Sequence, residues 1–259
     1  MNHLPGSVHV SPDTEALFEA LGETMMSSAL DAVEQRGVFH VALSGGGTPE
    51  PFYIRLLTDP KFRLMPWAKT HLWIVDERCV PEDHDKSNIK MIREALSDHA
   101  GIPEDQVHPM PVLADDPAGD YEDQLSKAFD MIPADGVPQL DWVLLGMGGD
   151  CHTASLFPES PALTSTRWID TNDGEKVVPP PRVTMTYPLI NAAREIAVLA
   201  VGGGKTAALT RVATQIESGS PDIVNIPISG IAPDNLTWYL DNAAAGLPLS
   251  WQWPHSRFL

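Results

Sequence analysis

The sequence predicts an α/β protein with a doubly wound, mostly parallel sheet and helices on both faces. Short apolar runs, rich in Val, Ile and Leu, recur along the chain, and segments with helical spacing separate them. Strands buried on both faces are continuous apolar runs, whereas half-exposed strands alternate between polar and apolar residues, so the pattern favours a parallel sheet covered by helices. Several apolar runs also end in glycines, as ligand-binding strand ends do in such sheets.

The elements follow from periodicity and from stop signals. The first helix carries apolar positions at helical spacing and ends at Gly37, and a second opens at Thr48 and Pro49, where Thr48 is expected to be the N-cap. The expected helices are 13–36, the segment from Pro49 onward, 87–98, 117–131 and 205–217. The expected strands are 38–44, 71–77, 141–147, 195–203 and 223–230.

Composition bounds the class of protein. The 259 residues suit one α/β domain over 1–259, and the net charge of −18 disfavours partners recognised through a nucleic-acid backbone or an anionic membrane. Two cysteines do not make a disulfide scaffold, and we expect neither a signal peptide nor a membrane span. We therefore expect a cytoplasmic protein, and the sequence leaves open whether it is a monomer or a weak dimer.

Four strand ends carry polar or glycine-rich segments that should meet at one edge of the sheet. These are Ser44-Gly-Gly-Gly-Thr-Pro, Asp76-Glu-Arg, Gly146-Met-Gly-Gly-Asp-Cys-His and Gly202-Gly-Gly-Lys. Consecutive glycines before a helix let the backbone approach an anion, and the helix N-terminus favours negative charge. The loop of Gly45, Gly46, Gly47 and Thr48 is therefore an expected anion site.

The other strand ends supply charged groups. Asp76 and Arg78 follow a strand, although a structural ion pair is an equally good interpretation on sequence alone. His152 follows Asp150 by two residues, so the carboxylate could orient an imidazole that accepts a proton from water. Arg182 and Lys205 are further candidates for holding an anion.

Several other motifs are weaker. Ser44 lies in a degenerate nucleophile elbow that lacks the first glycine. The segment 146–151 approaches a dinucleotide fingerprint, with Asp170 as the ribose acid, but Cys151 replaces its third glycine and two prolines interrupt the helix that should follow. A Cys151 nucleophile beside His152 is disfavoured because adjacent side chains project apart. The acidic segment 82–85 lacks a matching ligand set, so no metal is expected.

Taken together, the motifs resemble those of the 6-phosphogluconolactonases. The resemblance covers nearly the whole chain and rests on LSGGGTP (43–49), VDERCVPEDHDKSN (75–88), LGMGGDCHTASLFP (145–158), PRVTMT (181–186), GGGKTAAL (202–209) and the C-terminal segment 227–245. It implies a fold related to glucosamine-6-phosphate deaminases and hydrolysis of 6-phospho-D-glucono-1,5-lactone to 6-phospho-D-gluconate in the oxidative pentose phosphate pathway. The implied partner is this small lactone, and no cofactor is implied.

The resemblance also implies roles for single residues. His152 corresponds to the catalytic histidine, and Asp150, Asp76 and Arg78 correspond to active-site positions. The groups that hold the phosphate correspond to Gly45, Gly46, Gly47, Thr48, Arg182 and Lys205.

Two positions near the histidine qualify this interpretation. Related deaminases carry a carboxylate five residues after the histidine, where this chain has Phe157, which disfavours an aminosugar-phosphate deaminase/isomerase. A non-catalytic sugar-phosphate sensor is the other alternative. The family usually has glycine immediately before the histidine, where this chain has Cys151, and cysteine would be strained there if the backbone needs a positive φ. We expect activity to survive this change.

Overall fold

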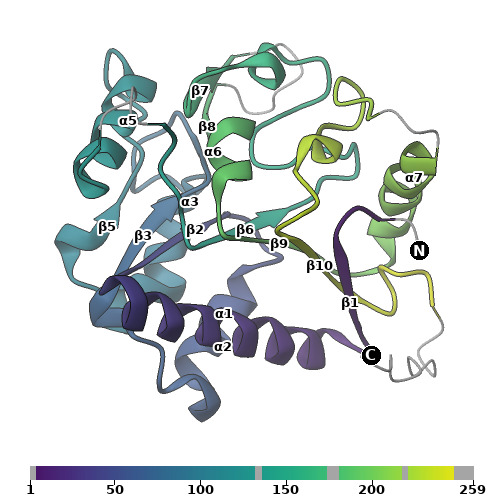
Figure 1. The fold of residues 1–259 in the computed structure, drawn as a ribbon, viewed down its shortest axis with the longest axis horizontal. Helices are drawn as coiled ribbons and strands as arrows, with labels where there is room; N and C mark the ends of the chain where they lie inside the picture. The colour runs from purple at the N-terminus through teal and green to yellow at the C-terminus, as the bar shows by residue number, and fades with distance from the viewer. Residues whose placement is uncertain (1–3, 132–135, 174–180, 218–220, 248–259) are drawn as a thin grey trace.

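A seven-stranded, wholly parallel sheet forms the centre of the protein (Figure 1). The computed structural model describes residues 4–131, 136–173, 181–217 and 221–247. The strand order is β1-β10-β9-β6-β2-β3-β5. The strands are β1 Ser7–Ser11, β2 Phe39–Leu43, β3 Thr70–Ile74, β5 Val107–His108, β6 Trp142–Gly146, β9 Glu195–Ala200 and β10 Leu236–Asp241.

Helices cover both faces of the sheet, which confirms the predicted fold class. In Figure 1 the strands cross the middle of the view, with α1 below them and α6 above. The helices are α1 Thr14–Arg36, α2 Glu50–Thr58, α3 Asn88–Ile92, α4 Asp98–Ala100, α5 Pro117–Ala128, α6 Tyr187–Ala192 and α7 Thr206–Glu217. A π-turn, Arg93–Ser97, joins α3 to α4 and completes the helix predicted for 87–98.

The sheet is doubly wound about the pair β2 and β6. From β2 the chain builds outward through β3 to β5, and from β6 it builds the other way through β9 to β10. Loops that leave neighbouring strands in opposite directions leave a crevice beyond the carboxyl ends of those strands. The glycine loop after β2 and the loop after β6 therefore face one another.

A second, three-stranded antiparallel sheet corrects one prediction. It consists of β4 Asp76–Arg78, β8 Arg182–Met185 and β7 Ile169–Asn172. The single strand predicted for 71–77 is instead split between the two sheets at Val75. The Val75 N–H donates to Leu43 of β2 at 3.0 Å, whereas its carbonyl accepts from the Met185 N–H at 2.8 Å.

Two further predictions were wrong. The strand predicted for 223–230 is a turn followed by a short 3₁₀-helix, Pro227–Gly230, and the strand that pairs with β9 is β10. Pro227 has no N–H to donate to a ladder, so an apolar run was mistaken for a strand. Thr48 is not the N-cap of α2, because Pro49 occupies that position and no side chain caps the helix.

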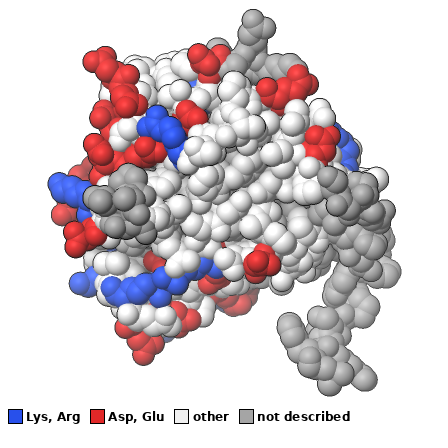
Figure 2. All heavy atoms as spheres, turned by 45° about the horizontal axis from the view of Figure 1, so that its top comes forward, with Lys and Arg blue, Asp and Glu red and all other residues white. Residues whose placement is uncertain are grey.

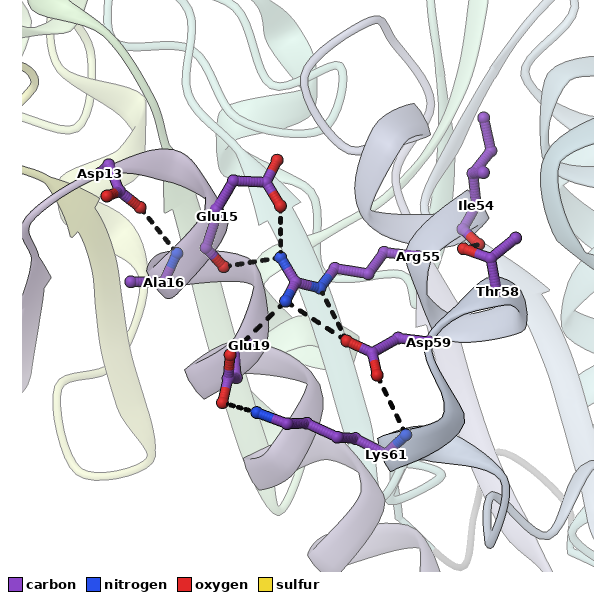
Figure 3. Close-up of polar contacts among 9 residues, drawn as sticks. All are labelled: Asp13, Glu15, Ala16, Glu19, Ile54, Arg55, Thr58, Asp59 and Lys61. Atoms are coloured by element: carbon purple, nitrogen blue, oxygen red, sulfur yellow. Dashed lines mark hydrogen bonds and ion pairs between the residues drawn. The ribbon is translucent and has the colours of Figure 1, made fainter.

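A network of ion pairs joins α1 to α2 (Figure 3). The Arg55 guanidinium lies 2.6 Å from a Glu15 carboxylate oxygen, 3.5 Å from Glu19 and 3.3 Å from Asp59. Glu19 also pairs with Lys61, in the 3₁₀-turn that follows α2. Because several charges share partners and the Arg55 side chain is only 18% exposed, this network fixes the crossing of the two helices better than an isolated surface pair would.

Three histidines lie on neighbouring strands at the other end of the sheet from the glycine loop. His40 is opposite His71 in the ladder, and the His71 and His108 rings meet with Nδ1 and Nε2 3.0 Å apart. The Trp73 indole N–H donates to His40 Nδ1 at 3.1 Å, so His40 is held neutral. Burial, followed by the nearby His71 and His108, lowers the pKa of His40 to about 3, and burial lowers that of His108 to about 4.

This cluster predicts a loss of stability in mild acid. Because the folded pKa of His40 lies below its unfolded value of about 6.5, its contribution is complete above pH 6.5 and is lost as the pH falls toward 3. Urea unfolding should show that the free energy of unfolding falls by roughly 1–3 kcal/mol from this site between pH 7 and pH 4. His40→Gln should flatten that slope, whereas the exposed His99→Gln control should not. Equal slopes for all three proteins would refute the assignment.

Candidate active site

A cavity of about 360 Å³ opens beyond the carboxyl ends of β2 and β6. It brings together residues from four separate strand ends. The predicted site residues that line it are Gly45, Gly46, Gly47, Thr48, Asp76, Arg78, His152, Arg182 and Lys205. Asp150 does not line the cavity, but it contacts His152 directly. The convergence expected from the sequence is therefore found in the structure.

The Asp150 and His152 side chains form a close pair. Asp150 Oδ1 lies 2.6 Å from His152 Nδ1 and accepts the His152 backbone N–H at 3.1 Å. Partial burial acts to raise the pKa of Asp150, but the hydrogen bonds and charge of His152 outweigh it and lower the pKa. An ionised carboxylate only accepts hydrogen bonds, so Nδ1 carries a proton, and in the neutral imidazole Nε2 is then the nitrogen with the lone pair.

Gly148 is a site residue that the sequence analysis did not single out. A Cβ atom at this position would lie 2.2 Å from His152 Nδ1 and 2.4 Å from Asp150 Oδ1. The Gly148 N–H also donates to the His152 carbonyl at 2.8 Å. The absence of a side chain at Gly148 is what allows the imidazole and the carboxylate to meet.

The Asp76-Glu77-Arg78 segment combines two roles. Glu77 is buried and accepts backbone N–H groups of Arg78, Asn88 and Ile89 at 2.7–2.8 Å, so it organises the start of α3. Burial raises the pKa of Glu77, and those three N–H groups act in the opposite direction. Asp76 and Arg78 instead line the cavity, which means that the structural and functional interpretations of this motif apply to different residues.

Arg78 is fixed at one end and has an unused donor. Its Nη1 donates to the Lys86 carbonyl at 2.7 Å, and its buried Nε has no partner among the described residues. Lys205 is similar, because its Nζ donates to the Met147 carbonyl at 2.6 Å and an ammonium has three N–H groups. Both side chains line the cavity, and each has more N–H groups than these carbonyl contacts use.

The glycine loop needs its glycines for space and for backbone conformation. A Cβ at Gly45 would lie 1.9 Å from the Asn88 side-chain oxygen, and the Asn88 amide donates to the Asp76 carbonyl at 2.6 Å. Gly46 adopts φ +105°, which side chains rarely tolerate. The loop is thus packed against the strand end that carries Asp76 and Arg78.

Arg182 lies on the aromatic wall of the cavity. Its guanidinium carbon is 5.7 Å from the centre of the Phe157 ring, and that ring packs against His152 with 4.4 Å between centroids. Burial lowers the pKa of Arg182, partly offset by Asp76, whose carboxylate is 3.6 Å away. Ser155, which the sequence analysis also missed, lies between Arg182 and Asp76.

Cys151 adopts φ +71°, so the position does require the left-handed backbone that suits glycine. Its side chain is fully buried and faces away from the cavity, with Sγ 3.7 Å from the Ala208 carbonyl. Burial raises the pKa of its thiol, which disfavours the thiolate. The geometry therefore agrees with rejecting Cys151 as a nucleophile.

Two other motifs have structural roles. The Ser44 hydroxyl donates to the Leu144 carbonyl at 2.8 Å, so its proton is not directed at a base. The loop after β6 leads into the short 3₁₀-helix Pro161–Thr164 instead of an α-helix, and the Asp170 side chain accepts the Thr171 N–H within β7. Neither a nucleophile elbow nor a dinucleotide site is formed.

The charge of the cavity opposes that of the whole protein. Acidic residues number 35 against 17 basic ones, and in Figure 2 acidic side chains stand around much of the rim of one face. The cavity lining instead combines Arg78, Arg182 and Lys205 with one carboxylate, Asp76, among the described residues. A local excess of cations in an acidic protein favours a small anionic ligand over an extended polyanion.

Within the described part of the chain, no helix is long and apolar enough to span a bilayer.

The Gly148 contacts predict a sharp effect of a single methyl group. Gly148→Ala should displace the imidazole from Asp150, and it should lower roughly 100-fold the kcat of a reaction that uses His152 as an oriented general base. The matched control is Gly149→Ala, because a Cβ at Gly149 meets nothing within 4 Å. Steady-state kinetics and melting curves of both variants would check this. A Gly148→Ala enzyme with the wild-type kcat would contradict the packing argument.

Comparisons with known proteins agree with this geometry. A 6-phosphogluconolactonase from Nostoc sp. is 39% identical over 251 residues, covering 94% of this chain and 98% of that protein. The 6-phosphogluconolactonase of Mycobacterium tuberculosis is 39% identical over 254 residues, covering 95% and 100%. A solved 6-phosphogluconolactonase from Trypanosoma cruzi superposes with a TM-score of 0.79 at 26% identity, covering 95% and 98%. Residues 12–239 match the family described as glucosamine-6-phosphate isomerases/6-phosphogluconolactonase, and the chain belongs to this family.

Proposed function

We propose that this protein hydrolyses 6-phospho-D-glucono-1,5-lactone to 6-phospho-D-gluconate, the lactonase step of the oxidative pentose phosphate pathway. One observation carries the proposal: an imidazole with a free nitrogen and three cationic side chains line the same cavity. The names of the full-length relatives support the choice of substrate. The lactone is a small anion with one electrophilic carbonyl, which matches a cavity of this size and charge.

His152 is the general base of the proposed reaction. Asp150 holds Nδ1–H, so Nε2 takes a proton from a water molecule, and the resulting hydroxide attacks C1 of the lactone. The bond between C1 and the ring oxygen then breaks, and the ring oxygen receives the proton from His152. The product is a hydroxy acid whose carboxyl group loses its proton to solvent and becomes a carboxylate. Asp150 orients the ring and stabilises the imidazolium that forms.

The remaining cavity groups have two tasks. The loop from Gly45 to Thr48, together with Arg182 and Lys205, holds the phosphate and so positions C1 near His152. Arg78, whose side chain lines the cavity, stabilises the oxyanion that develops on the carbonyl oxygen, and Asp76 accepts a hydrogen bond from a substrate hydroxyl.

Phe157 favours hydrolysis over aminosugar-phosphate deamination. Its ring packs on His152 where the deaminases have a carboxylate, so the imidazole has Asp150 as its acidic partner. The proposed reaction needs no cofactor. We further propose that residues 1–259 act as one domain, in the cytoplasm, as a monomer or a weak dimer.

The direct test follows loss of the lactone, generated in place by glucose-6-phosphate dehydrogenase. The protein should accelerate hydrolysis above the spontaneous rate, and His152→Ala should lower kcat roughly 100-fold because water then lacks its base. His99→Ala, an exposed histidine on another part of the chain, is the matched control. Equal rates for wild type and His152→Ala would refute the role of His152, and a wild type no faster than buffer would refute the function.

Cys151 predicts an inverted order of stability. At an ordinary site glycine is about 0.5–1 kcal/mol less stable than alanine, but a left-handed backbone costs an L-residue about 1–2 kcal/mol. Cys151→Gly should therefore unfold at a higher urea concentration than Cys151→Ala, which loses the buried sulfur and keeps the strain. All three proteins should hydrolyse the lactone at similar rates. If only Cys151→Gly were active, the expectation that activity survives the cysteine would be wrong.

A further inference from the structure

Ser155 links three parts of the proposed site, although it does not line the cavity. It lies three residues after His152 in the sequence, and its side chain is fully buried. We infer that Ser155 is a positioning residue that sets Arg182 and Asp76 relative to His152. This inference rests on the proposed function, because Ser155 would position Arg182, the side chain proposed to bind the substrate phosphate.

The Ser155 hydroxyl bridges Arg182 and Asp76 by accepting one hydrogen bond and donating the other. Its O–H donates to Asp76 Oδ2 at 2.6 Å, and its oxygen accepts Arg182 Nη1 at 3.3 Å. The direct distance from Arg182 Nη1 to Asp76 Oδ2 is 3.6 Å, too long for a hydrogen bond. Each bond of this chain involves an ionised partner, and such bonds are roughly twice as strong as neutral ones. The hydroxyl therefore keeps the arginine and the carboxylate apart at a defined spacing.

The Ser155 backbone is fixed just as firmly. Its N–H donates to Thr184 Oγ1 at 3.1 Å, and its carbonyl accepts from the Asn172 amide at 2.9 Å. Thr184 belongs to β8, which also carries Arg182 and pairs with Asp76, and Asn172 belongs to β7, the other neighbour of β8. Ser155 thus attaches the loop that carries His152 to both β7 and β8 of the small sheet.

Removal of the hydroxyl has a specific consequence. Without it, Asp76 loses a donor at 2.6 Å and Arg182 loses one of its acceptors, so the two buried charges, 3.6 Å apart, are drawn together. Arg182 then leaves the position from which it lines the cavity. The imidazole is held separately, by Asp150 and Gly148, so its chemistry is unaffected.

The test separates binding from chemistry. Ser155→Ala should raise KM for the lactone, and Kd for 6-phosphogluconate measured by titration calorimetry, roughly tenfold while kcat changes little. Ser155→Cys, which restores a weak donor and acceptor, should recover part of the affinity. The control is Ser97→Ala, which removes another buried hydroxyl, one without a partner among the described residues, far along the sequence in the turn after α3. Melting curves would be recorded for every variant.

A double-mutant cycle decides whether Ser155 acts through Arg182. In an Arg182→Gln background, Ser155→Ala should no longer weaken binding, because the group that it positions is absent. Additive losses of affinity, or a Ser155→Ala protein with wild-type KM and Kd, would overturn the inference while leaving the lactonase proposal intact. An inactive wild type would overturn the proposed function instead, and a crystal structure of Ser155→Ala would then judge the inference by whether Arg182 has moved.

Discussion

The two backbone hydrogen bonds of Val75 are the constraint on which the site depends. Its N–H continues the pairing of β3 with β2 at the Leu43 carbonyl, and its carbonyl accepts from Met185 of β8 in the small sheet. The next residues, Asp76 and Arg78, are therefore delivered from the end of a parallel strand into an antiparallel ladder with Arg182. This change of sheet thus brings the three charged side chains into one cavity with the glycine loop and His152, which follow strands β2 and β6 of the large sheet.

The loop that carries His152 combines backbone strain with close attachment. Cys151, Ala154 and Glu159 all have positive φ values, between 50° and 71°, although none is glycine. Such conformations cost about 1–3 kcal/mol each and persist only where the surroundings enforce them. Here Ile228 donates to the Cys151 carbonyl and Glu159 donates to Val224, while Ser155 is bound from the small sheet. The loop is held by the segment after α7 and by the small sheet, which suits a site that must be rigid before its ligand arrives.

Much of this arrangement could be predicted from the sequence, and the failures have physical causes. The fold class followed from apolar runs, and the cavity residues followed from strand ends, since parallel strands bring their carboxyl ends together. The split at Val75 was missed because β3 and β4 form one uninterrupted run of strand-like residues, and only long-range pairing separates them. Strand β10 was overlooked in favour of 223–230, where Pro227 prevents a ladder.

Within the site, the sequence indicated the residues with reactive or charged groups better than the residues that hold those groups in place. His152, Arg78 and Lys205 carry groups whose chemistry is evident from their type. Gly148 leaves room for the His152 and Asp150 side chains, and Ser155 bridges Asp76 and Arg182. Both roles depend on tertiary contacts that no local sequence pattern encodes. The signal for Gly148 was present, because it stands among more glycines than a turn needs, but it did not distinguish a steric role from a ligand-binding one.

Cys151 narrows the substitutions that this position can accept. The left-handed backbone acts as a conformational filter, which favours glycine and tolerates asparagine or aspartate. Full burial against α7 acts as a second filter, on volume and polarity, and it rejects an amide or a carboxylate without partners. Few side chains meet both the backbone and the burial requirement, and the cysteine side chain is small and apolar enough to do so at a moderate conformational cost. Neutral drift beside the proposed base is therefore confined to a few small residues, so the neighbour of His152 can vary in identity while the path of the backbone stays the same.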